Sequence, residues 1–310
     1  MIGLKSKVRV ESPASIANFG PGYDTFGLCL DRPVDIIDLE RSSKPGIMIE
    51  IAKSGFSVPV DPARNTASVA AQQIIKISGS SSKSIGLKMK LLKKIRPGSG
   101  LGSSAASAVA GALGAAAILG IDDVKEILKA ASIGEGASSG APHLDNVSPC
   151  LFGGFTAVVN PDEFDVLQIE PLDVKIAVCL PEIVVETAKA RRLIPKQLPI
   201  ESIVSHVGWA SGMIVGLNNG DIDLMAVCMQ DDIAVPVRKK LIKGYENARK
   251  AALDAGALSF SVSGSGPAVF SLAKGNHNSI GKAMVRGFAE VGVNSEFFVA
   301  RPGTGARIVG

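Results

Sequence analysis

Pro97-Gly-Ser-Gly-Leu-Gly-Ser-Ser-Ala-Ala106 is the stretch of sequence that decides the fold. Three glycines alternate along it: Gly98, Gly100 and Gly102. Glycine lets the backbone approach a ligand without a Cβ clash, and the residues that follow, 103–119, are predicted to form a helix. A helix start presents free N–H groups and the positive end of the helix dipole, so this stretch predicts a phosphate site.

Two common phosphate-binding motifs do not fit this loop. A Walker A loop requires Gly-Lys-Ser/Thr, and here Gly102 is followed by two serines. The dinucleotide fingerprint requires a different glycine spacing and is not expected in the middle of a chain. The hydroxyl groups of Ser103 and Ser104 are ligands for phosphate or for Mg²⁺. A structural interpretation, a helix start with small residues for close packing, is the alternative for the loop taken alone.

Composition limits the classes of function. The chain has 310 residues, of which 46% are apolar, which predicts two domains with sizeable cores and excludes a disordered protein. Its 33 basic and 29 acidic residues are mixed along the sequence, with a net charge of +4. Nucleic-acid and membrane-surface binders usually carry clustered charge. We therefore expect no nucleic-acid partner and no membrane partner.

The cysteines and the first residues predict a cytoplasmic protein. Four cysteines are widely spaced among apolar neighbours: Cys29, Cys150, Cys179 and Cys228. They form no C-x-x-C pair, so we expect reduced thiols that fill space in the core, and neither a zinc site nor a disulfide framework. The first ten residues contain no apolar run typical of a signal peptide. Residues 101–121 are long enough to cross a bilayer but consist mostly of Ala, Gly and Ser, which makes a membrane span improbable.

The first half of the chain is predicted to be a mixture of strands and helices. Strands are expected at 8–11, 27–30, 36–40, 46–52, 85–92 and 150–159. Helices are expected at 67–77 with Asn65 as the cap, at 103–119, and at 122–133 with Asp122 as the cap. Glu135 would then lie just beyond the third helix.

A polar, proline-containing stretch at 160–171 suggests a domain boundary near residue 171, with domains at 1–171 and 172–310. In the second domain, strands are expected at 174–180, 259–262, 268–272 and 295–300, and helices at 200–218, 221–227, 237–255 and 279–291. Strands paired with helices in this way predict an α+β domain with an antiparallel sheet.

Four segments together resemble the GHMP kinases, a family that phosphorylates galactose, homoserine, mevalonate and phosphomevalonate. Beside the loop at 97–106, they are Pro13-Ala-Ser-Ile-Ala-Asn-Phe-Gly-Pro-Gly-Tyr-Asp24, Pro142-His-Leu-Asp-Asn-Val-Ser-Pro-Cys-Leu-Phe-Gly-Gly154 and Ser261-Val-Ser-Gly-Ser-Gly-Pro-Ala-Val-Phe270. The segments at 13–24 and 142–154 are similar to those of family members that act on homoserine. The resemblance implies a two-domain fold: an N-terminal ribosomal-protein-like α+β domain with a left-handed crossover and a C-terminal ferredoxin-like α+β domain.

The resemblance also implies an ATP site and a magnesium site. The expected ATP-binding residues are Asn65, Pro97, Gly98, Ser99, Gly100, Leu101, Gly102, Ser103 and Ser104. Mg²⁺ prefers hard oxygen ligands and keeps several waters, and the resemblance assigns it Glu135 and Ser104, with Ser103 as the nearest alternative. Asn65 serves equally well as a plain helix cap.

For the acceptor, the resemblance implies L-homoserine, a zwitterion with a primary hydroxyl group. Asp24 would bind the ammonium group, and Asn18 would hydrogen-bond near the reacting end. Thr187 and Arg191, four residues apart on one helix face, and Arg238 would bind the carboxylate. His143 and Gly264 are expected to contact the substrate as well.

The expected reaction is transfer of the ATP γ-phosphoryl group to this hydroxyl, with Asn18, Asp145 and Asn146 as catalytic candidates. Phosphoryl transfer depends mainly on positioning and charge neutralisation, so the sequence leaves open whether Asp145 is a base or an asparagine merely orients the hydroxyl. Another family kinase, such as one acting on mevalonate, and a non-catalytic ligand sensor are the alternatives. Family members are often homodimers, but the sequence identifies no interface.

Overall fold

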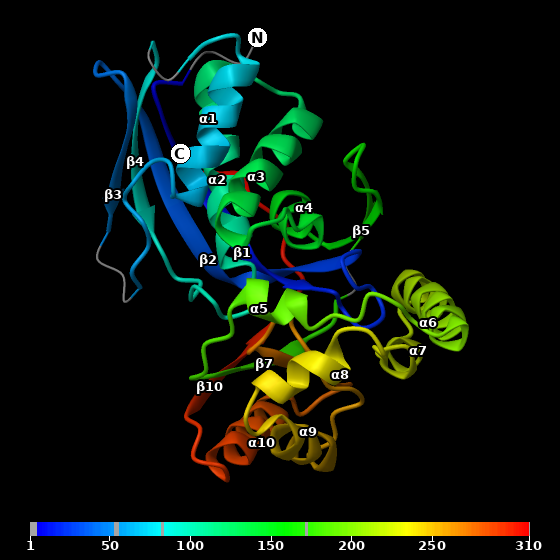
Figure 1. Ribbon diagram of the computed structural model, residues 1–310. Coiled ribbons are helices and arrows are strands. Elements are labelled where there is room, and N and C mark those ends of the chain that lie inside the picture. The colour runs from blue at the N-terminus through cyan, green and yellow to red at the C-terminus, as the bar shows by residue number, and fades with distance from the viewer. Residues whose placement is uncertain (1–4, 53–55, 82–83, 171–172, 310) are drawn as a thin grey trace.

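The computed structural model describes residues 5–52, 56–81, 84–170 and 173–309. Within these ranges the chain forms two parts, each a β-sheet with helices, which meet near helix α5 (Thr187–Arg192) (Figure 1). The boundary predicted at residue 171 lies outside the described residues. Mixed α+β content in two parts agrees with the predicted fold class.

Seven of the described strands form the first sheet. Its order is β11 (Arg307–Ile308), β1 (Lys7–Ala17), β2 (Phe26–Ser42), β4 (Gly86–Leu92) and β3 (Gly46–Ile51). The first residues of β2 also pair with β5 (Phe155–Asn160), which pairs with β6 (Asp165–Ile169). β3 and β4 are parallel neighbours joined through α1 (Thr66–Ile77), and this connection is the crossover of the first domain.

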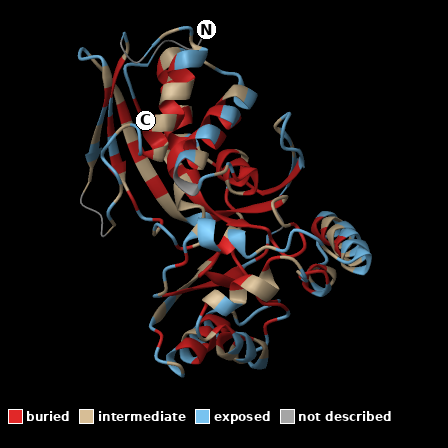
Figure 2. Ribbon diagram, viewed as in Figure 1, coloured by how far each residue is buried: buried red, intermediate tan, exposed pale blue. Residues whose placement is uncertain are grey.

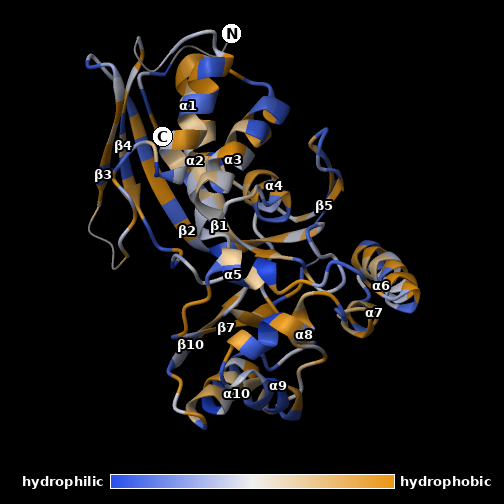
Figure 3. Cartoon of the chain, in the orientation of Figure 1, coloured by the Kyte–Doolittle hydropathy of each residue, from blue (hydrophilic) through white to orange (hydrophobic). Residues whose placement is uncertain are grey.

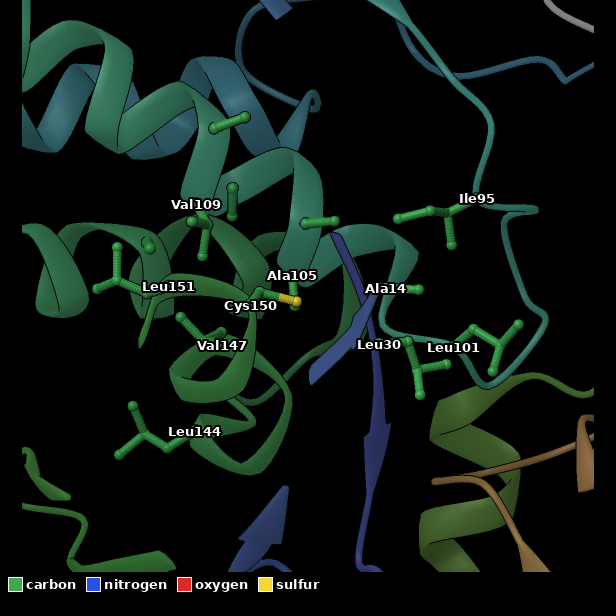
Figure 4. Close-up of a cluster of buried hydrophobic side chains, with 14 of the residues drawn as sticks. Ala14, Leu30, Ile95, Leu101, Ala105, Val109, Leu144, Val147, Cys150 and Leu151 are labelled. Carbon is green, nitrogen blue, oxygen red and sulfur yellow. The ribbon is translucent and has the colours of Figure 1, made fainter. Parts of the chain in front are cut away.

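Three helices pack on one another beside the first sheet: α1, α2 (Ser103–Leu119) and α3 (Val124–Ser139), and α2 lies against β1 and β2 (Figure 1). Helix α2 is the central one and is buried almost all round, which its Ala- and Gly-rich sequence permits (Figure 2). The segment considered as a bilayer span is therefore a core helix of the first domain. Figure 4 shows Leu101, Ala105 and Val109 at its start, packed with apolar side chains of β1, β2 and α4 (Leu144–Phe152).

The second sheet has the strand order expected of a ferredoxin-like domain. It runs β10 (Ser295–Ala300), β7 (Ile176–Pro181), β9 (Val269–Leu272) and β8 (Ser261–Val262), with every neighbouring pair antiparallel. Helices α9 (Tyr245–Asp254) and α10 (His277–Ala289) pack on each other and contribute to its core. β11 then returns to pair with β1, so the chain end joins the first sheet and not the second.

Between β7 and α9 the chain forms four helices and a short 3₁₀ turn: α5, α6 (Ile200–Asn219), α7 (Ile222–Val227), α8 (Val235–Arg238) and the turn Lys239–Leu241. A single helix at 237–255 was therefore a wrong prediction. The chain is extended at Ile242 and left-handed at Gly244, which caps α9, so α8 and α9 are separate.

Two predictions in the first domain were also wrong. Helix α3 begins with Asp123, not Asp122, as its cap and continues to Ser139, so Glu135 lies inside it. Gly134 serves close packing and is not a helix end. A Cβ at this position would lie 2.6 Å from the Cβ of Ala70, so only glycine lets α3 approach α1 this closely. Residues 150–152 belong to α4, not to a strand.

Helix α4 forms despite Pro149 because its apolar residues recur on one side. Leu144, Val147 and Leu151 follow helical spacing and are buried in the core of the first domain. The packing of this side therefore outweighs the cost of an internal proline. The helix begins at His143, which places the predicted residues Asp145 and Asn146 in its first turn.

Candidate active site

A cavity of about 320 Å³ lies where the two parts of the chain meet. The first domain contributes the 97–104 loop, the end of β1 and the facing ends of α3 and α4. The second contributes α5, Arg238 and the turn at 264–265. Predicted site residues that line the cavity are Asn18, Asp24, Asn65, Pro97, Gly98, Ser99, Gly100, Gly102, Ser103, Ser104, Glu135, His143, Asp145, Asn146, Thr187, Arg238 and Gly264.

The glycine-rich loop has the backbone conformation that the sequence predicted. Gly98, Gly100 and Gly102 all have positive φ angles, of 70°, 80° and 65°. No side chain caps α2, so its first N–H groups remain available to a ligand beside the cavity. A Cβ on Gly98 would meet no protein atom within 4 Å. These features suit an anionic group resting on the loop.

The turn at 263–266 supports this loop from the second domain. Ser263 Oγ donates a hydrogen bond of 2.6 Å to the carbonyl oxygen of Gly100, and the amide of Ala268 donates to the carbonyl oxygen of Ser99. A Cβ on Gly100 would lie 2.6 Å from the carbonyl oxygen of Ser263. Backbone from two domains is thus closely packed at the loop, which holds it rigid.

Ser104 and Glu135 meet at the cavity wall. Ser104 Oγ donates a hydrogen bond of 3.1 Å to Glu135 Oε1, whereas Ser103 Oγ donates to the carbonyl oxygen of Ile95. Of the two serines, Ser104 is therefore the one whose hydroxyl lies beside the carboxylate. Glu135 can reach Ser104 because α3, which carries Glu135, packs against α1 and α2.

His143 lies against the same carboxylate. Its backbone N–H donates to Glu135 Oε2 at 3.0 Å, and its Nδ1 lies 3.2 Å from that oxygen. Burial lowers the pKa of His143, but the hydrogen bond and negative charge of Glu135 outweigh burial and raise this pKa above its ordinary value. The sequence placed His143 near the substrate; the structure adds that it holds the Glu135 side chain in position.

Asn18 and Asp24 lie on the turn between β1 and β2 in left-handed backbone conformations, with φ of 69° and 54°. Asn18 Oδ1 accepts a hydrogen bond from the Asp24 amide, and its Nδ2 lies 3.4 Å from the carbonyl oxygen of Gly264. Asp24 Oδ2 accepts a hydrogen bond of 2.7 Å from Arg191. The negative charge of Asp24 outweighs the effect of burial and raises the pKa of Arg191.

Arg238 is a buried cation at the second-domain side of the cavity. Its side chain is 4% exposed, and Nη1 donates a hydrogen bond of 2.8 Å to the carbonyl oxygen of Gly264. The guanidinium carbon lies 5.3 Å from the ring centroid of Tyr23. Its Nε has no hydrogen-bond partner among the described atoms. Burial lowers the pKa of Arg238, so an anion bound beside it would be strongly stabilised.

Asp145 is a buried acid with an unsatisfied oxygen. Its Oδ1 has no hydrogen-bond partner among the described atoms. Burial, and secondarily the charge of Asp24, raises the pKa of Asp145 to about 7. Its neighbour Asn146 accepts a hydrogen bond of 3.0 Å from Ser15 Oγ. A carboxylic acid that titrates near neutral pH inside a cleft is a candidate proton acceptor.

Thr187 and Arg191 lie on α5 as predicted but do not share one partner. Thr187 Oγ1 lies 3.3 Å from Ser265 Oγ at the cavity, while Arg191 reaches Asp24 and does not line the cavity. Leu101 also does not line it, because its side chain is buried in the core (Figure 4). Only the backbone of Leu101 remains as a contact for a nucleotide.

The far end of the cavity contains residues that the sequence did not indicate: Ser57, Val58, Pro59, Arg64, Thr66 and Leu91. Asn65 lies among them, and both the oxygen and the nitrogen of its side-chain amide form hydrogen bonds. Its Oδ1 accepts from the Ser68 amide as the cap of α1, and its Nδ2 donates to the carbonyl oxygen of Pro59. Asn65 therefore shapes this part of the wall, which agrees with the helix-cap interpretation.

Lys93 is a second residue that the sequence did not reveal. Its buried Nζ forms an ion pair with Asp35 and donates to Ser107 Oγ and to the carbonyl oxygen of Ser103. Burial lowers the pKa of Lys93 despite the opposing charge of Asp35. The ion pair ties the end of β4 to β2, and the two hydrogen bonds from Lys93 tie it to the start of α2. The alternation along β4 indicates that Lys93 is buried, because Leu87, Met89 and Leu91 are buried on one side of the strand and Lys93 continues that series.

The residues present fit a weakly held divalent cation. Among the described residues, no cluster of three or more His, Cys, Asp or Glu side chains could hold a metal ion by itself. Glu135 and Ser104 supply one carboxylate and one hydroxyl at the start of α2. Mg²⁺ is commonly bound through one or two carboxylates together with substrate phosphates and water, so this limited donor set suits it.

Comparison with known proteins identifies the family. The model for the GHMP kinase N-terminal domain matches residues 65–154, and the model for the GHMP kinase C-terminal domain matches residues 213–290. Homoserine kinase from Pyrococcus horikoshii is 42% identical over 303 residues, which are 97% of this chain and 99% of that protein. Homoserine kinase from Thermococcus kodakarensis is 44% identical over 299 residues, 96% of this chain and 99% of that protein.

Solved structures agree. The crystal structure of homoserine kinase from Cytophaga hutchinsonii superposes with a TM-score of 0.91 at 36% identity, covering 100% of this chain and 99% of that one. Mevalonate kinase from L. major, solved with R-mevalonate, has a TM-score of 0.72 at 18% identity, covering 96% and 98%, and shares the fold alone. With both family domains matched and relatives above 40% identity along nearly its whole length, this chain belongs to the GHMP kinase family and is an ATP-dependent phosphotransferase.

Proposed function

We propose that this enzyme transfers the γ-phosphoryl group of ATP to the side-chain hydroxyl of L-homoserine and forms O-phospho-L-homoserine, a step toward threonine. Relatives named homoserine kinase at 42% and 44% identity support this substrate. Four free, buried cysteines are in keeping with a cytoplasmic site of action.

The observation that carries the proposal is the pair of opposite charges at the acceptor end of the cavity. Arg238 is buried with an unpartnered Nε, and the carboxylate of Asp24 lies on the opposite domain. An amino acid presents both complementary charges, a carboxylate and an ammonium group. Mevalonate has a carboxylate and no ammonium group, so it offers Asp24 no cation to bind, and this carboxylate would keep Arg191 as its only cationic partner among the described residues. We therefore favour homoserine over mevalonate as the acceptor.

At the donor end, the 97–104 loop and the start of α2 would hold the triphosphate through backbone N–H groups. Glu135 and Ser104 would hold Mg²⁺, and the ion when bound would neutralise charge on the phosphates. His143 keeps the Glu135 carboxylate directed to this position. The adenine would occupy the wall near Val58, where the structure offers apolar surface and the rigid cap of α1.

For the hydroxyl proton, we propose Asp145 as the acceptor. Its buried Oδ1 has no other partner among the described atoms, and its pKa of about 7 is suited to accept a proton at neutral pH. Asn18 and Asn146, which both line the cavity, would orient the hydroxyl. Positioning and charge neutralisation still supply most of the rate, because the transition state of phosphoryl transfer is loose.

Mass spectrometry tests the proposed reaction directly. The enzyme is incubated with ATP, Mg²⁺ and L-homoserine, and in parallel with D-homoserine or mevalonate. We expect O-phosphohomoserine and ADP in equal amounts with L-homoserine only. Turnover of mevalonate without turnover of homoserine would reject the substrate, and ATP binding without any turnover would favour a ligand sensor.

A further inference from the structure

A buried acidic side chain anchors the turn that leads into α8, the short helix that ends at Arg238. Asp231 Oδ1 accepts hydrogen bonds from the amides of Ile233 and Ala234, both at 2.7 Å. Its Oδ2 accepts a third, from the amide of Val235 at 3.2 Å. The Asp231 side chain is only 3% exposed. Burial of a carboxylate is costly unless hydrogen bonds replace its water, and these three consecutive amides supply them.

Asp231 is connected to Arg238 through the backbone of one intervening residue. The amide of Ala234 donates a hydrogen bond to Asp231 Oδ1. The carbonyl oxygen of Ala234 accepts one of 2.9 Å from the amide of Arg238. Ala234 itself is buried. A movement of Ala234 would therefore shift the backbone of Arg238 and with it the origin of the arginine side chain.

Helix α8 is too short to hold this position by itself. It has four residues, and helices of this length are unstable without other contacts. Figure 3 shows mostly hydrophobic colour along α8, and Val235 packs on the core of the second domain. Pro236, in the first turn, has no N–H to donate. Apolar contact thus presses the helix onto its domain, while the Asp231 carboxylate fixes the point at which the helix begins.

Helix α6 fixes the other side of this turn. Its residue His206 is buried, and the His206 ring packs on that of Trp209 with 5.2 Å between the centroids. His206 Nε2 accepts a hydrogen bond of 3.4 Å from the amide of Asp232. The same nitrogen lies 3.8 Å from Asp231 Oδ1, which is too far for a hydrogen bond. The turn is therefore tied to α6 through the backbone of Asp232, and the Asp231 carboxylate directs its hydrogen bonds to the start of α8.

We propose that Asp231 is a positioning residue that holds Arg238 where it meets the carboxylate of the acceptor. This inference rests on the proposed function, which makes the acceptor an amino acid. At its tip, the guanidinium of Arg238 is held by the carbonyl oxygen of Gly264 and by the ring of Tyr23. These contacts leave Nε without a hydrogen-bond partner among the described atoms. The direction of this N–H then depends on the backbone of Arg238, which Asp231 holds in place.

A purely structural role for Asp231 would have a different signature. Asp231 lies in the second domain, whereas the phosphate loop at 97–104 and Glu135 belong to the first. If the carboxylate only stabilised the fold, its removal would lower the free energy of unfolding and impair all substrates alike. If it positions Arg238, its removal weakens the binding of acceptors that carry a carboxylate and spares acceptors that lack one.

Steady-state kinetics with two acceptors test the proposal. In Asp231→Ala, kcat/KM for L-homoserine should fall at least about tenfold, mainly through KM, because Arg238 is no longer held in place. The value for 3-aminopropan-1-ol, which lacks the carboxylate, and the KM for ATP should change less than about threefold. Asp231→Asn keeps an oxygen for the two bonds of 2.7 Å and should recover most of the loss. Asp232→Ala is the matched control, because Asp232 is exposed and alanine retains the amide that bonds His206; it should behave as the wild type does.

Hydrogen exchange followed by mass spectrometry gives a second readout that needs no substrate. In Asp231→Ala, the amides of residues 233–238 should exchange at least about tenfold faster than in the wild type, while those of α10 keep their wild-type rates. Asp231→Ser, whose shorter side chain cannot reach all three amides, gives the same comparison if the alanine variant does not fold.

Three results would each overturn the proposal: equal losses with both acceptors in a folded variant, an Asp231→Asn variant as impaired as Asp231→Ala, or unchanged exchange over residues 233–238. A wild-type enzyme that does not phosphorylate homoserine would instead reject the proposed function. The exchange rates would then still decide whether Asp231 holds Arg238 in place.

Discussion

Replacement of Arg238 by methionine should weaken binding of the acceptor's carboxylate and leave the rest of the reaction nearly unchanged. The guanidinium is 4% exposed and its Nε is unpartnered among the described atoms, so an incoming carboxylate would find a desolvated donor. A hydrogen bond to a charged group contributes about 1.5–3 kcal/mol. Losing a two-bond fork therefore removes about 3 kcal/mol or more, which is a fall of about 10²-fold or more in kcat/KM.

The assay compares two acceptors that differ by one group. L-Homoserine carries the carboxylate, and 3-aminopropan-1-ol lacks it while keeping the ammonium and hydroxyl groups. For Arg238→Met, kcat/KM with homoserine should fall about 10²-fold or more, while the low value for the amino alcohol should change less than about threefold. Arg238→Lys keeps the charge but not the fork and should fall between the wild type and the methionine variant.

Two controls separate binding from structure. Arg192 is the exposed neighbour of Arg191 on α5, and Arg192→Met should leave both substrates unaffected. Arg238 also donates to the carbonyl oxygen of Gly264, so thermal unfolding of Arg238→Met must be measured. Equal losses with homoserine and with 3-aminopropan-1-ol in a folded variant would refute the reasoning, because the arginine would then not act through the carboxylate.

Three further changes test other parts of the site. Asp145→Asn should lower kcat about 10²-fold and abolish the rise in kcat as pH increases through about 7. A loss of less than about tenfold would reject Asp145 as the base and would mean that the site works by positioning the hydroxyl. Because the folded state holds this proton up to about pH 7 and the unfolded state releases it near 3.8, unfolding free energy should fall as pH rises between these values, less steeply in Asp145→Asn. Gly100 has a φ of 80°, and a Cβ there would lie 2.6 Å from the carbonyl oxygen of Ser263, so Gly100→Ala should distort the loop and raise the KM for ATP at least about tenfold. An unchanged KM in steady-state kinetics would contradict a tightly fixed loop. Lys93→Met should lower the unfolding free energy by about 3 kcal/mol in urea titrations, because Asp35 stays buried without a cation and keeps only the hydrogen bonds from the Lys94 and Ile95 amides. A loss under about 1 kcal/mol would contradict a stabilising ion pair.

Local sequence signals predicted the backbone of the glycine-rich loop and of the helices beside it well. The alternating glycines of 98–102 require positive φ angles, and each has one. Asn65 and the helix at 103–119 follow from capping and composition, and both predictions were confirmed. The choice between Ser103 and Ser104 could not be made from sequence, because it depends on which hydroxyl faces α3.

What the sequence did not reveal depends on contacts between distant segments. Glu135 lies inside a helix because Gly134 packs on α1, although a glycine usually suggests a helix end. Asp35 and Lys93 pair across 58 residues, and each taken alone resembles a surface charge. The residues around Val58 come from an irregular segment without a motif, so only the fold shows that they line the cavity.

A crystal structure with a non-hydrolysable ATP analogue and Mg²⁺ tests the central claim most directly. We expect the β- and γ-phosphate oxygens within hydrogen-bond distance of backbone amides in residues 98–104, with the metal ion between them and Glu135. Phosphates bound at any other surface, with this loop empty, would contradict the proposed site and the roles assigned to its residues.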